Sequence, residues 1–190
     1  MPTALNRNLR IAVGDGVELR PLRLEDAEPV YYLVAANRER LAEWLPWVPS
    51  MQSAADEAAF IRSGHGAIEA GTGLSCAIVV DRVVVGTMGC VITPQSRSAE
   101  IGYWIAEGFE GRGIVTRAAR ALTTFLVTDL DLHRVVIRAA TDNARSRAVP
   151  ERLGFMHEGT QRHAEILNGN FFDLEVYSIL APEWPTNGAH

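Results

Sequence analysis

The stretch EGRGIVTRAARALTTFL, residues 110–126, joins a glycine-containing turn to an amphipathic helix. It follows a β-rich segment, SAEIGYWIA at residues 98–106, so the chain passes from strand through turn to helix. The spacing of the apolar residues predicts a helix from about Ile114 to Thr128. A helix start leaves backbone N–H groups unpaired and carries partial positive charge, so this segment is a candidate anion site.

The composition of the turn supports an anion site but does not prove one. Gly111 and Gly113 allow the backbone to approach a ligand because they carry no Cβ atom. Thr116 adds a hydroxyl, and positive charge comes from three arginines: Arg112, Arg117 and Arg120. The stretch lacks the lysine and spacing of a P-loop and the third glycine of a dinucleotide-binding fingerprint. The turn alone therefore leaves two interpretations, an anion site or a strand–helix connection that favours glycine.

The rest of the chain completes a regular order of elements. A strand begins in VELRPLRLED (17–26). Three helical segments follow. The first runs from residue 25 or 26 to about 37, the second lies in RERLAEWLPWVP (38–49), and the third runs from the Ser53 cap to residues 71–73. Later elements are the strands LSCAIVVD (74–81), VVVGTMGCVITP (83–94) and HRVVIRAAT (133–141), a short helix in DNARSRAVPERLGF (142–155), and the strands FMHEGTQRHAEIL (155–167) and FFDLEVYSIL (171–180). Residues 168 and 169, Asn-Gly, indicate a hairpin turn. This order predicts one α+β domain with a mixed sheet of seven strands.

Composition limits the function classes. The 190 residues include 47% hydrophobic and 22% charged residues, a balance that supports a globular core. The formal net charge of -5 argues against nucleic-acid binding through a basic face. Apolar stretches are too short for a membrane span, and the N-terminus lacks the apolar stretch of a signal peptide. We therefore expect a cytoplasmic protein with neither a nucleic-acid nor a membrane partner.

The two cysteines, Cys76 and Cys90, lie in apolar runs that are predicted to be strands. Neither has a His or Cys at metal-ligand spacing, so no metal site is expected. If residues 81 and 82 form the hairpin turn, Cys76 lies opposite Thr87 rather than Cys90. We expect both to be buried free thiols.

The strand–turn–helix arrangement resembles the GNAT superfamily of acyl-CoA-dependent N-acyltransferases. The loop of that family reads Gln or Arg, two residues, Gly, one residue, and Gly or Ala. Here Gly113 matches the fourth position, whereas Glu110 and Val115 depart from the first and sixth. A glutamate facing the ligand would repel a diphosphate, so we expect Glu110 to point outward.

Further motifs resemble the RimJ/RimL branch, named for N-terminal acetyltransferases of ribosomal proteins. They are LRPLRLEDA (19–27), LAEWLPWV (41–48), EIGYWI (100–105), N-x-x-S at 143–146 with ERLGF at 151–155, and GNFFDLEVYSIL (169–180). Each motif is weak alone, but their order along residues 17–180 is specific. The resemblance implies a single GNAT domain over 1–190 with a core of about 17–180 and short tails. It also implies a mostly antiparallel sheet, helices on both faces, and a splay between the fourth and fifth of the seven strands.

The resemblance implies acetyl-CoA as co-substrate and assigns residues to it. Diphosphate contacts are expected from the backbone of the turn: Gly111, Arg112, Gly113, Ile114, Val115 and Thr116. Contacts to the pantetheine arm are expected from the main chain of Trp104, Ile105 and Ala106 and from Asn143, which would also cap its helix. One backbone N–H of the strand would polarise the thioester carbonyl.

Two carboxylates are candidates for the general base. Glu100 begins EIGYWI, where several GNAT enzymes carry a glutamate base, and Glu165 lies where the RimL branch carries one. The sequence does not choose between them, and either could instead be a surface charge at a strand edge. His163, two residues from Glu165, would share its strand face and is a reserve candidate.

Ser146 is the candidate general acid, because the helix that carries a tyrosine acid in much of the superfamily has none here. Its alternative role is an ordinary polar residue in the first turn of a helix. Pro150 should leave the carbonyl of Ser146 without its helical N–H partner, free for water or ligand, and should bend the helix. Alternatively, the helix ends near Val149.

Trp44 and Trp47 are predicted to pack in the core or to line the acceptor pocket.

The expected activity is transfer of an acetyl group from acetyl-CoA to a primary amine at a protein or peptide N-terminus. The alternatives are a small-molecule amine, an antibiotic or a lysine side chain as acceptor, a larger acyl group such as succinyl, and a non-catalytic CoA sensor. The presence of Glu100, Glu165 and Ser146 favours an enzyme. A homodimer remains open.

Overall fold

The computed structural model describes residues 5–167 and 169–185. Within them the strands are β1 (Ile11–Gly14), β2 (Val17–Pro21), β3 (Gly73–Val80), β4 (Val83–Thr93), β5 (Ser98–Ile105), β6 (Arg134–Ala140), β7 (Met156–Leu167) and β8 (Asn170–Leu180). The α-helices are α1 (Ala27–Ala36), α2 (Arg38–Ala42), α3 (Ala54–Ala70), α4 (Ile114–Thr128) and α5 (Ala144–Arg152). Short 3-10 turns cover Leu24–Asp26, Val48–Ser50, Pro94–Ser96, Glu107–Phe109 and Ala181–Glu183.

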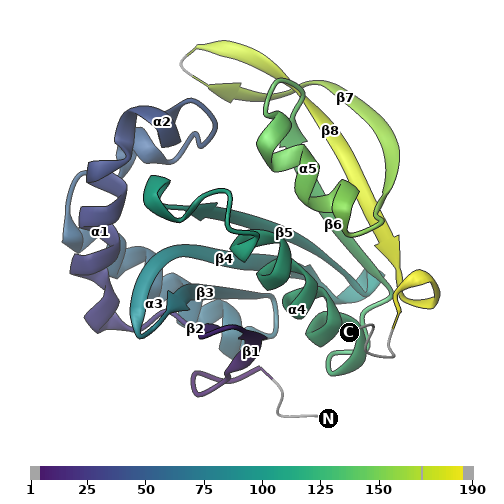
Figure 1. Ribbon diagram of the computed structural model, residues 1–190, viewed down its shortest axis with the longest axis horizontal. Coiled ribbons are helices and arrows are strands. Elements are labelled where there is room, and N and C mark those ends of the chain that lie inside the picture. Colours follow the sequence, from purple (N-terminus) through teal and green to yellow (C-terminus); the bar gives the residue numbers. More distant parts are fainter. Residues whose placement is uncertain (1–4, 168, 186–190) are drawn as a thin grey trace.

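One open sheet runs through the structure in the order β1-β2-β3-β4-β5-β6-β8-β7 (Figure 1). All neighbours pair antiparallel except β5 and β6, which are parallel. The predicted mixed, mostly antiparallel α+β fold is confirmed, but the count of seven strands is wrong by one. The extra strand is β1, where Ile11 pairs with Leu19. It has four residues and a register irregularity, too little alternation for a sequence pattern to reveal.

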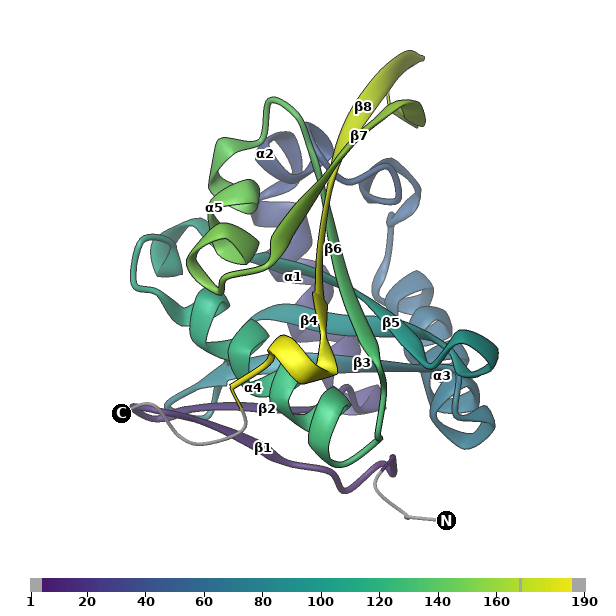
Figure 2. The same cartoon turned by 90° about the vertical axis from the view of Figure 1, so that its right-hand side faces the viewer.

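Helices cover both faces of the sheet, α1 and α3 on one and α4 and α5 on the other (Figures 1 and 2). The α4 side has a hydrophobic core around fully buried side chains such as Leu122 and Leu126. The α1–α3 side has a second core that includes Val34 and Ile61. Full burial of one such side chain stabilises the fold by roughly 1.5–3 kcal/mol.

The predicted helix ends agree with local chemistry. Ser53 caps α3 by accepting a hydrogen bond from the N–H of Asp56 at 3.2 Å. Gly71 ends that helix in the left-handed region, with φ of 70°. Helix α4 begins at Ile114 and ends at Thr128, as its apolar spacing predicts. Among the described residues, no helix is both long and apolar enough to cross a membrane.

The splay that positions the site lies between β5 and β6. Their parallel pairing joins only four residue pairs, from Ser98 with Arg134 to Ile101 with Ile137. Beyond Ile101 the strands separate, so the β6-facing side of the end of β5 has no strand partner. The predicted splay between the fourth and fifth predicted strands is therefore present, between β5 and β6.

The register of β3 against β4 differs from the predicted one, and the predicted turn at residues 168 and 169 is only partly described. Cys76 pairs with Met88 rather than Thr87, because a bulge near Ile78 and Val79 shifts the β3–β4 register by one residue. Both cysteines are buried free thiols, as predicted. In the predicted hairpin turn Gly169 has φ of 79°, whereas residue 168 and the tail residues 1–4 and 186–190 lie outside the described part.

Candidate active site

A cavity of about 1110 Å³ opens where β5 and β6 separate. Its walls come from α2 and the residues after it, from β5 to β8, from the start of α4 and from α5. Most of the predicted site residues line it: Glu100, Trp104, Ile105, Gly111, Gly113, Ile114, Val115, Thr116, Asn143, Ser146 and Glu165. Sequence positions up to 65 residues apart therefore meet around one space.

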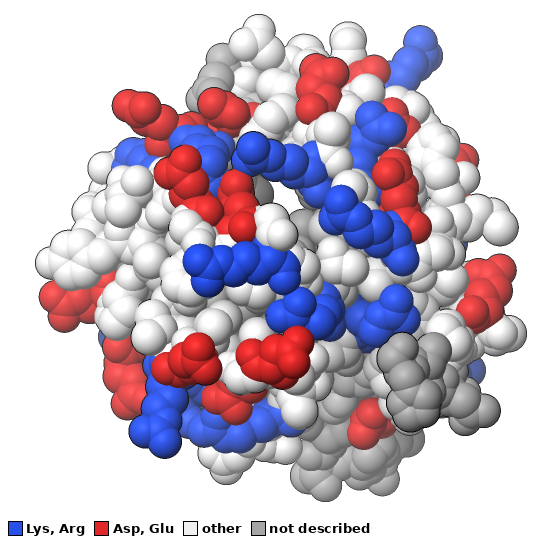
Figure 3. Space-filling view, in the orientation of Figure 1, with Lys and Arg blue, Asp and Glu red and all other residues white. Residues whose placement is uncertain are grey.

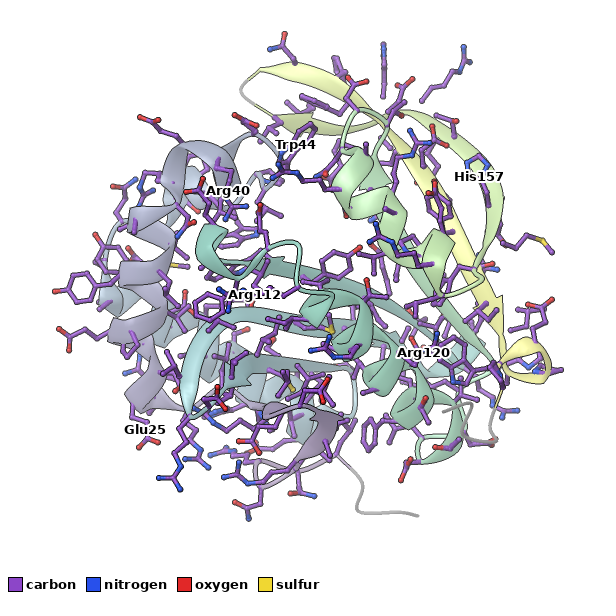
Figure 4. All side chains as sticks on the ribbon, viewed as in Figure 1. Glu25, Arg40, Trp44, Arg112, Arg120 and His157 are labelled. Atoms are coloured by element: carbon purple, nitrogen blue, oxygen red, sulfur yellow. The ribbon has the colours of Figure 1, made fainter. Side chains whose placement is uncertain are left out.

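Two predicted residues, Ala106 and Arg112, do not line the cavity. The N–H of Ala106 donates to the carbonyl of Val85 at 2.8 Å, so it belongs to the β4 side of β5. The guanidinium of Arg112 lies over the Phe109 ring, 5.1 Å from its centroid. Figure 4 shows Arg112 on the loop that leads into α4.

The glycine turn has the backbone shape that an anion site needs. Gly111 and Gly113 have φ of 71° and 69°, and Gly113 is the N-cap of α4. A Cβ at Gly111 would meet nothing within 4 Å, so the backbone there is open. A Cβ at Gly113 would lie 3.3 Å from Nη1 of Arg117, which donates to the carbonyl of Arg112 at 3.0 Å. This open helix start fits a phosphate group.

Glu110 does not point outward as expected but forms part of the cavity wall, with 23% of its side chain exposed. Its carboxylate accepts from Arg145 of α5 at 2.7 Å and also from Arg40 of α2. Arg40 further donates to the carbonyl of Ile105 at 2.8 Å. The two arginines partly offset the charge of the glutamate, which explains how the loop tolerates it. Basic side chains gather around this hollow in Figure 3, and all of them are arginines because the chain contains no lysine.

The acid candidate lies on the first turn of α5. Asn143 caps this helix by accepting the N–H of Ser146 at 3.0 Å. The Ser146 hydroxyl donates to the Tyr103 hydroxyl at 3.2 Å, which in turn donates to the Ser146 carbonyl at 3.0 Å. The helix continues through Pro150 to Arg152, so the alternative of an early end is wrong. The carbonyl of Ser146 is also not free, because Tyr103 occupies it.

The two base candidates line the same cavity, but only one of their carboxylates has an ion-pair partner. Glu100 accepts from Nε of Arg138 at 2.8 Å, in an ion pair between β5 and β6. Glu165 is half-buried, and among the described residues its carboxylate has no hydrogen-bond or ion-pair partner. The carboxylate of Glu100 is therefore held in an ion pair, whereas that of Glu165 is not.

His163 does not share a face with Glu165. The pairing of β7 with β8 is irregular between Gln161 and Glu165, and His163 itself has φ of 51°. Its ring stacks on Phe171 at 5.1 Å and is exposed, whereas Glu165 pairs with Phe172 on the cavity side. The bulge breaks the alternation on which the prediction depended.

The two tryptophans divide the predicted roles. Trp44 lines the cavity, on the same side as Arg40 (Figure 4). Trp47 packs against Trp104 with ring centroids 6.5 Å apart, next to the second hydrophobic core.

Sequence reasoning missed three residues that contact the predicted ones: Arg40, Tyr103 and Arg138. Tyr103 left a signal, since strand alternation places it between Ile101 and Ile105 on an otherwise apolar face. The two arginines left none, because ion pairs across 38 to 70 positions have no local pattern.

The family model described as an acetyltransferase (GNAT) domain matches residues 17–156. The chain belongs to the GNAT family. It is 38% identical over 174 residues to the putative ribosomal N-acetyltransferase YdaF of Bacillus subtilis, covering 90% of this chain and 95% of that protein. It is 30% identical to the ribosomal-protein-serine acetyltransferase of Escherichia coli, covering 88% and 94%.

Solved GNAT structures superpose closely on the chain. RimL, a ribosomal alpha-N-protein acetyltransferase in complex with coenzyme A, gives a TM-score of 0.88 at 29% identity and covers 90% of this chain and 98% of that one. The microcin C7 self immunity acetyltransferase MccE, with acetyl-CoA and AMP, gives 0.87 at 30% identity and covers 94% and 99%. This GNAT protein is therefore an N-acetyltransferase of the RimL type with acetyl-CoA as co-substrate, and its open glycine turn fits that group.

Proposed function

We propose that this GNAT enzyme acetylates the α-amino group of a protein or peptide N-terminus, with Glu165 as general base and Ser146 as general acid. The observation that carries the proposal is Glu165, an unpaired carboxylate on the wall of the cavity that also holds the glycine turn and Ser146. The names of the relatives YdaF and RimL support an acceptor of this class.

Glu165 is the better base of the two carboxylates. A base must reach the amine with its carboxylate, and the carboxylate of Glu100 is held by Nε of Arg138 at 2.8 Å. Glu165 has no such partner among the described residues. We assign to Glu100 the task of holding Arg138 at the cavity wall.

The chain's own residues supply the remaining functions. Acetyl-CoA supplies an activated acetyl group when it is bound. The turn at Gly111 and Gly113 would hold its diphosphate through backbone N–H groups. On β5, the N–H of Ala106 is paired with β4, so the N–H groups of Ile105 and Tyr103 are better placed to face the splay. The carbonyl of Ile105 already accepts from Arg40. The hydroxyl of Ser146 would give a proton to the leaving sulfur.

The proposed acceptor side of the cavity has apolar side chains on two walls. Trp44 and Pro46 line it from the α2 side, and Leu167 and Phe172 line it from the β7–β8 hairpin. Apolar walls with few polar groups suit the first side chain of a peptide. The likeness to MccE keeps a small-molecule amine as the second candidate.

The test is release of CoA from acetyl-CoA with a panel of peptides that carry ribosomal-protein N-termini. We expect release with free N-termini and none with the same peptides acetylated in advance. Blocked peptides that contain lysine test the side-chain alternative, and a panel of small amines tests the second candidate. Succinyl-CoA and propionyl-CoA test the acyl group. Turnover of small amines alone would refute the peptide acceptor, and CoA binding without any release would support a sensor.

Mass spectrometry of the enzyme gives a clean internal check. The 190 residues contain no lysine, so no lysine side chain among them can be acetylated. Peptide acetylation can therefore be measured without a background of modified lysines.

A further inference from the structure

A tyrosine hydroxyl from β5 contacts the proposed acid at two atoms. Tyr103 Oη lies 3.0 Å from the carbonyl oxygen of Ser146, to which it donates, and 3.2 Å from Ser146 Oγ, from which it accepts. Both residues line the cavity, and Tyr103 lies just beyond Ile101, where β5 leaves β6.

Pro150 explains why the carbonyl of Ser146 accepts this bond. In a regular helix that carbonyl would accept the N–H of residue 150, but proline has none. A buried carbonyl without a partner is costly, and the Tyr103 hydroxyl supplies one from outside the helix. The Tyr103 hydroxyl therefore links β5 to α5 at Ser146, the proposed general acid.

Tyr103 keeps its proton throughout the neutral range. Burial of its hydroxyl raises the pKa of Tyr103 to about 12. The hydroxyl therefore remains a donor at physiological pH, and it has two oxygens of Ser146 within reach.

We propose that Tyr103 supports Ser146 as the second donor of a two-hydroxyl relay, an inference that rests on the proposed role of Ser146. As the bond between the acetyl carbon and sulfur breaks, its electron pair stays on sulfur, and Ser146 Oγ gives that sulfur its proton. Tyr103 turns its O–H from the carbonyl to Oγ and gives its proton there, because a phenol is a stronger acid than an aliphatic alcohol. The proton that Glu165 takes from the amine returns to Tyr103 through water, which completes the balance.

The kinetic test uses Tyr103→Phe, Ser146→Ala and the double variant, with CoA release as the signal. Tyr103→Phe should lower kcat roughly tenfold or more, while KM for acetyl-CoA stays within about twofold. Because Tyr103 acts through Ser146, the double variant should be no slower than Ser146→Ala. Tyr31→Phe is the matched control, since Tyr31 also donates to a carbonyl, that of Gln52 at 2.9 Å, and should leave kcat unchanged.

A second test measures thermal unfolding without any substrate. Tyr103→Phe should lower Tm by about 3 °C, because it leaves the carbonyl of Ser146 unpaired. Pro150→Ala restores the missing backbone N–H, so in that background the same substitution should lower Tm by less than about 1 °C.

Specific kinetic and thermal results would overturn the relay or the structural link to Ser146. Unchanged kcat in Tyr103→Phe, or an equal further loss in the Ser146→Ala background, overturns the relay. Equal Tm losses with and without Pro150 overturn the structural link to Ser146. If no peptide is acetylated, the acceptor proposal fails, while kcat with any small amine that is acetylated and the Tm comparison still decide the role of Tyr103.

Discussion

The Glu110 carboxylate lies 2.7 Å from the guanidinium of Arg145, which joins the loop before α4 to helix α5. The same carboxylate pairs with Arg40 of α2. An acidic residue at the first position of the glycine turn is therefore held between two cations at the cavity wall. Its cost to the binding of an anionic co-substrate is reduced but not removed, since the carboxylate keeps its charge.

Glu110→Gln, which installs the residue type found elsewhere in the family, should tighten CoA binding. Loss of one negative charge leaves the positive charge of Arg40 and Arg145 less compensated, so it attracts the phosphates more strongly. We expect a gain of about 1 kcal/mol, roughly fivefold in Kd, at low salt and less at high salt. Calorimetry at two ionic strengths measures it, with Glu25→Gln, an exposed acid paired with Arg23, as control. Weaker binding would show that the carboxylate holds the arginines in place.

Glu165→Gln should lower kcat about a hundredfold or more without changing the affinity for CoA, because it removes the unpaired carboxylate. Glu100→Gln should have a much smaller effect, since Glu100 is already paired with Arg138. Steady-state kinetics and CoA titration of both variants decide the assignment. A larger loss in Glu100→Gln would reverse it, and full activity in both would exclude either residue as the base.

Gly113→Glu should abolish CoA binding. The new side chain puts a charge at the start of α4, and a non-glycine residue at φ of 69° is strained by about 1–3 kcal/mol. Gly66→Glu is the control, because it adds the same charge on exposed α3, where a Cβ meets nothing within 4 Å. Calorimetry reports binding and circular dichroism reports folding. Normal affinity in a folded Gly113→Glu protein would refute the loop assignment.

The burial of Glu57 should make the free energy of unfolding depend on pH, independently of the candidate active site. It is 3% exposed on α3, and burial raises its pKa from 4.5 to about 7. The unfolded chain releases this proton near pH 4.5 and the folded chain near 7, so Glu57 destabilises the fold increasingly over that interval.

Glu57→Gln should therefore raise the free energy of unfolding by on the order of 2 kcal/mol above pH 7, with little difference from wild type at pH 4. Urea unfolding at both pH values measures it. Glu69→Gln on the exposed face of α3 should change little. An equal gain at both pH values would mean that titration of Glu57 is not the cause.

Elements that depend on local chemistry could be predicted from the sequence. The cap at Ser53, the end of α3 at Gly71 and the start of α4 at Ile114 each follow from the chemistry of a few neighbouring residues. The strand β1 could not, because its four residues pair only through β2 and show no clear alternation.

The candidate site also has features that the sequence predicts and features that only the tertiary structure shows. The positions of Ser146 and Glu165 at one cavity followed from a family resemblance, whereas their electrostatic states depend on distant residues. That Arg138 pairs with Glu100 but leaves Glu165 alone is set by the tertiary structure. Likewise, the bulge that turns His163 away from the cavity has no signature in the alternation of β7.

The location of the cysteines has a consequence for oxidation. The RimL structure is described with CoA joined to a cysteine by a disulfide. Here the chain's only two cysteines are buried in β3 and β4, away from the cavity, and burial raises the pKa of Cys90 to about 12 and that of Cys76 above its usual range. A disulfide of CoA would meet no exposed protein thiolate that could attack it, so the folded enzyme should not form a mixed disulfide with CoA. A colorimetric thiol reagent added to the native protein would then titrate CoA alone.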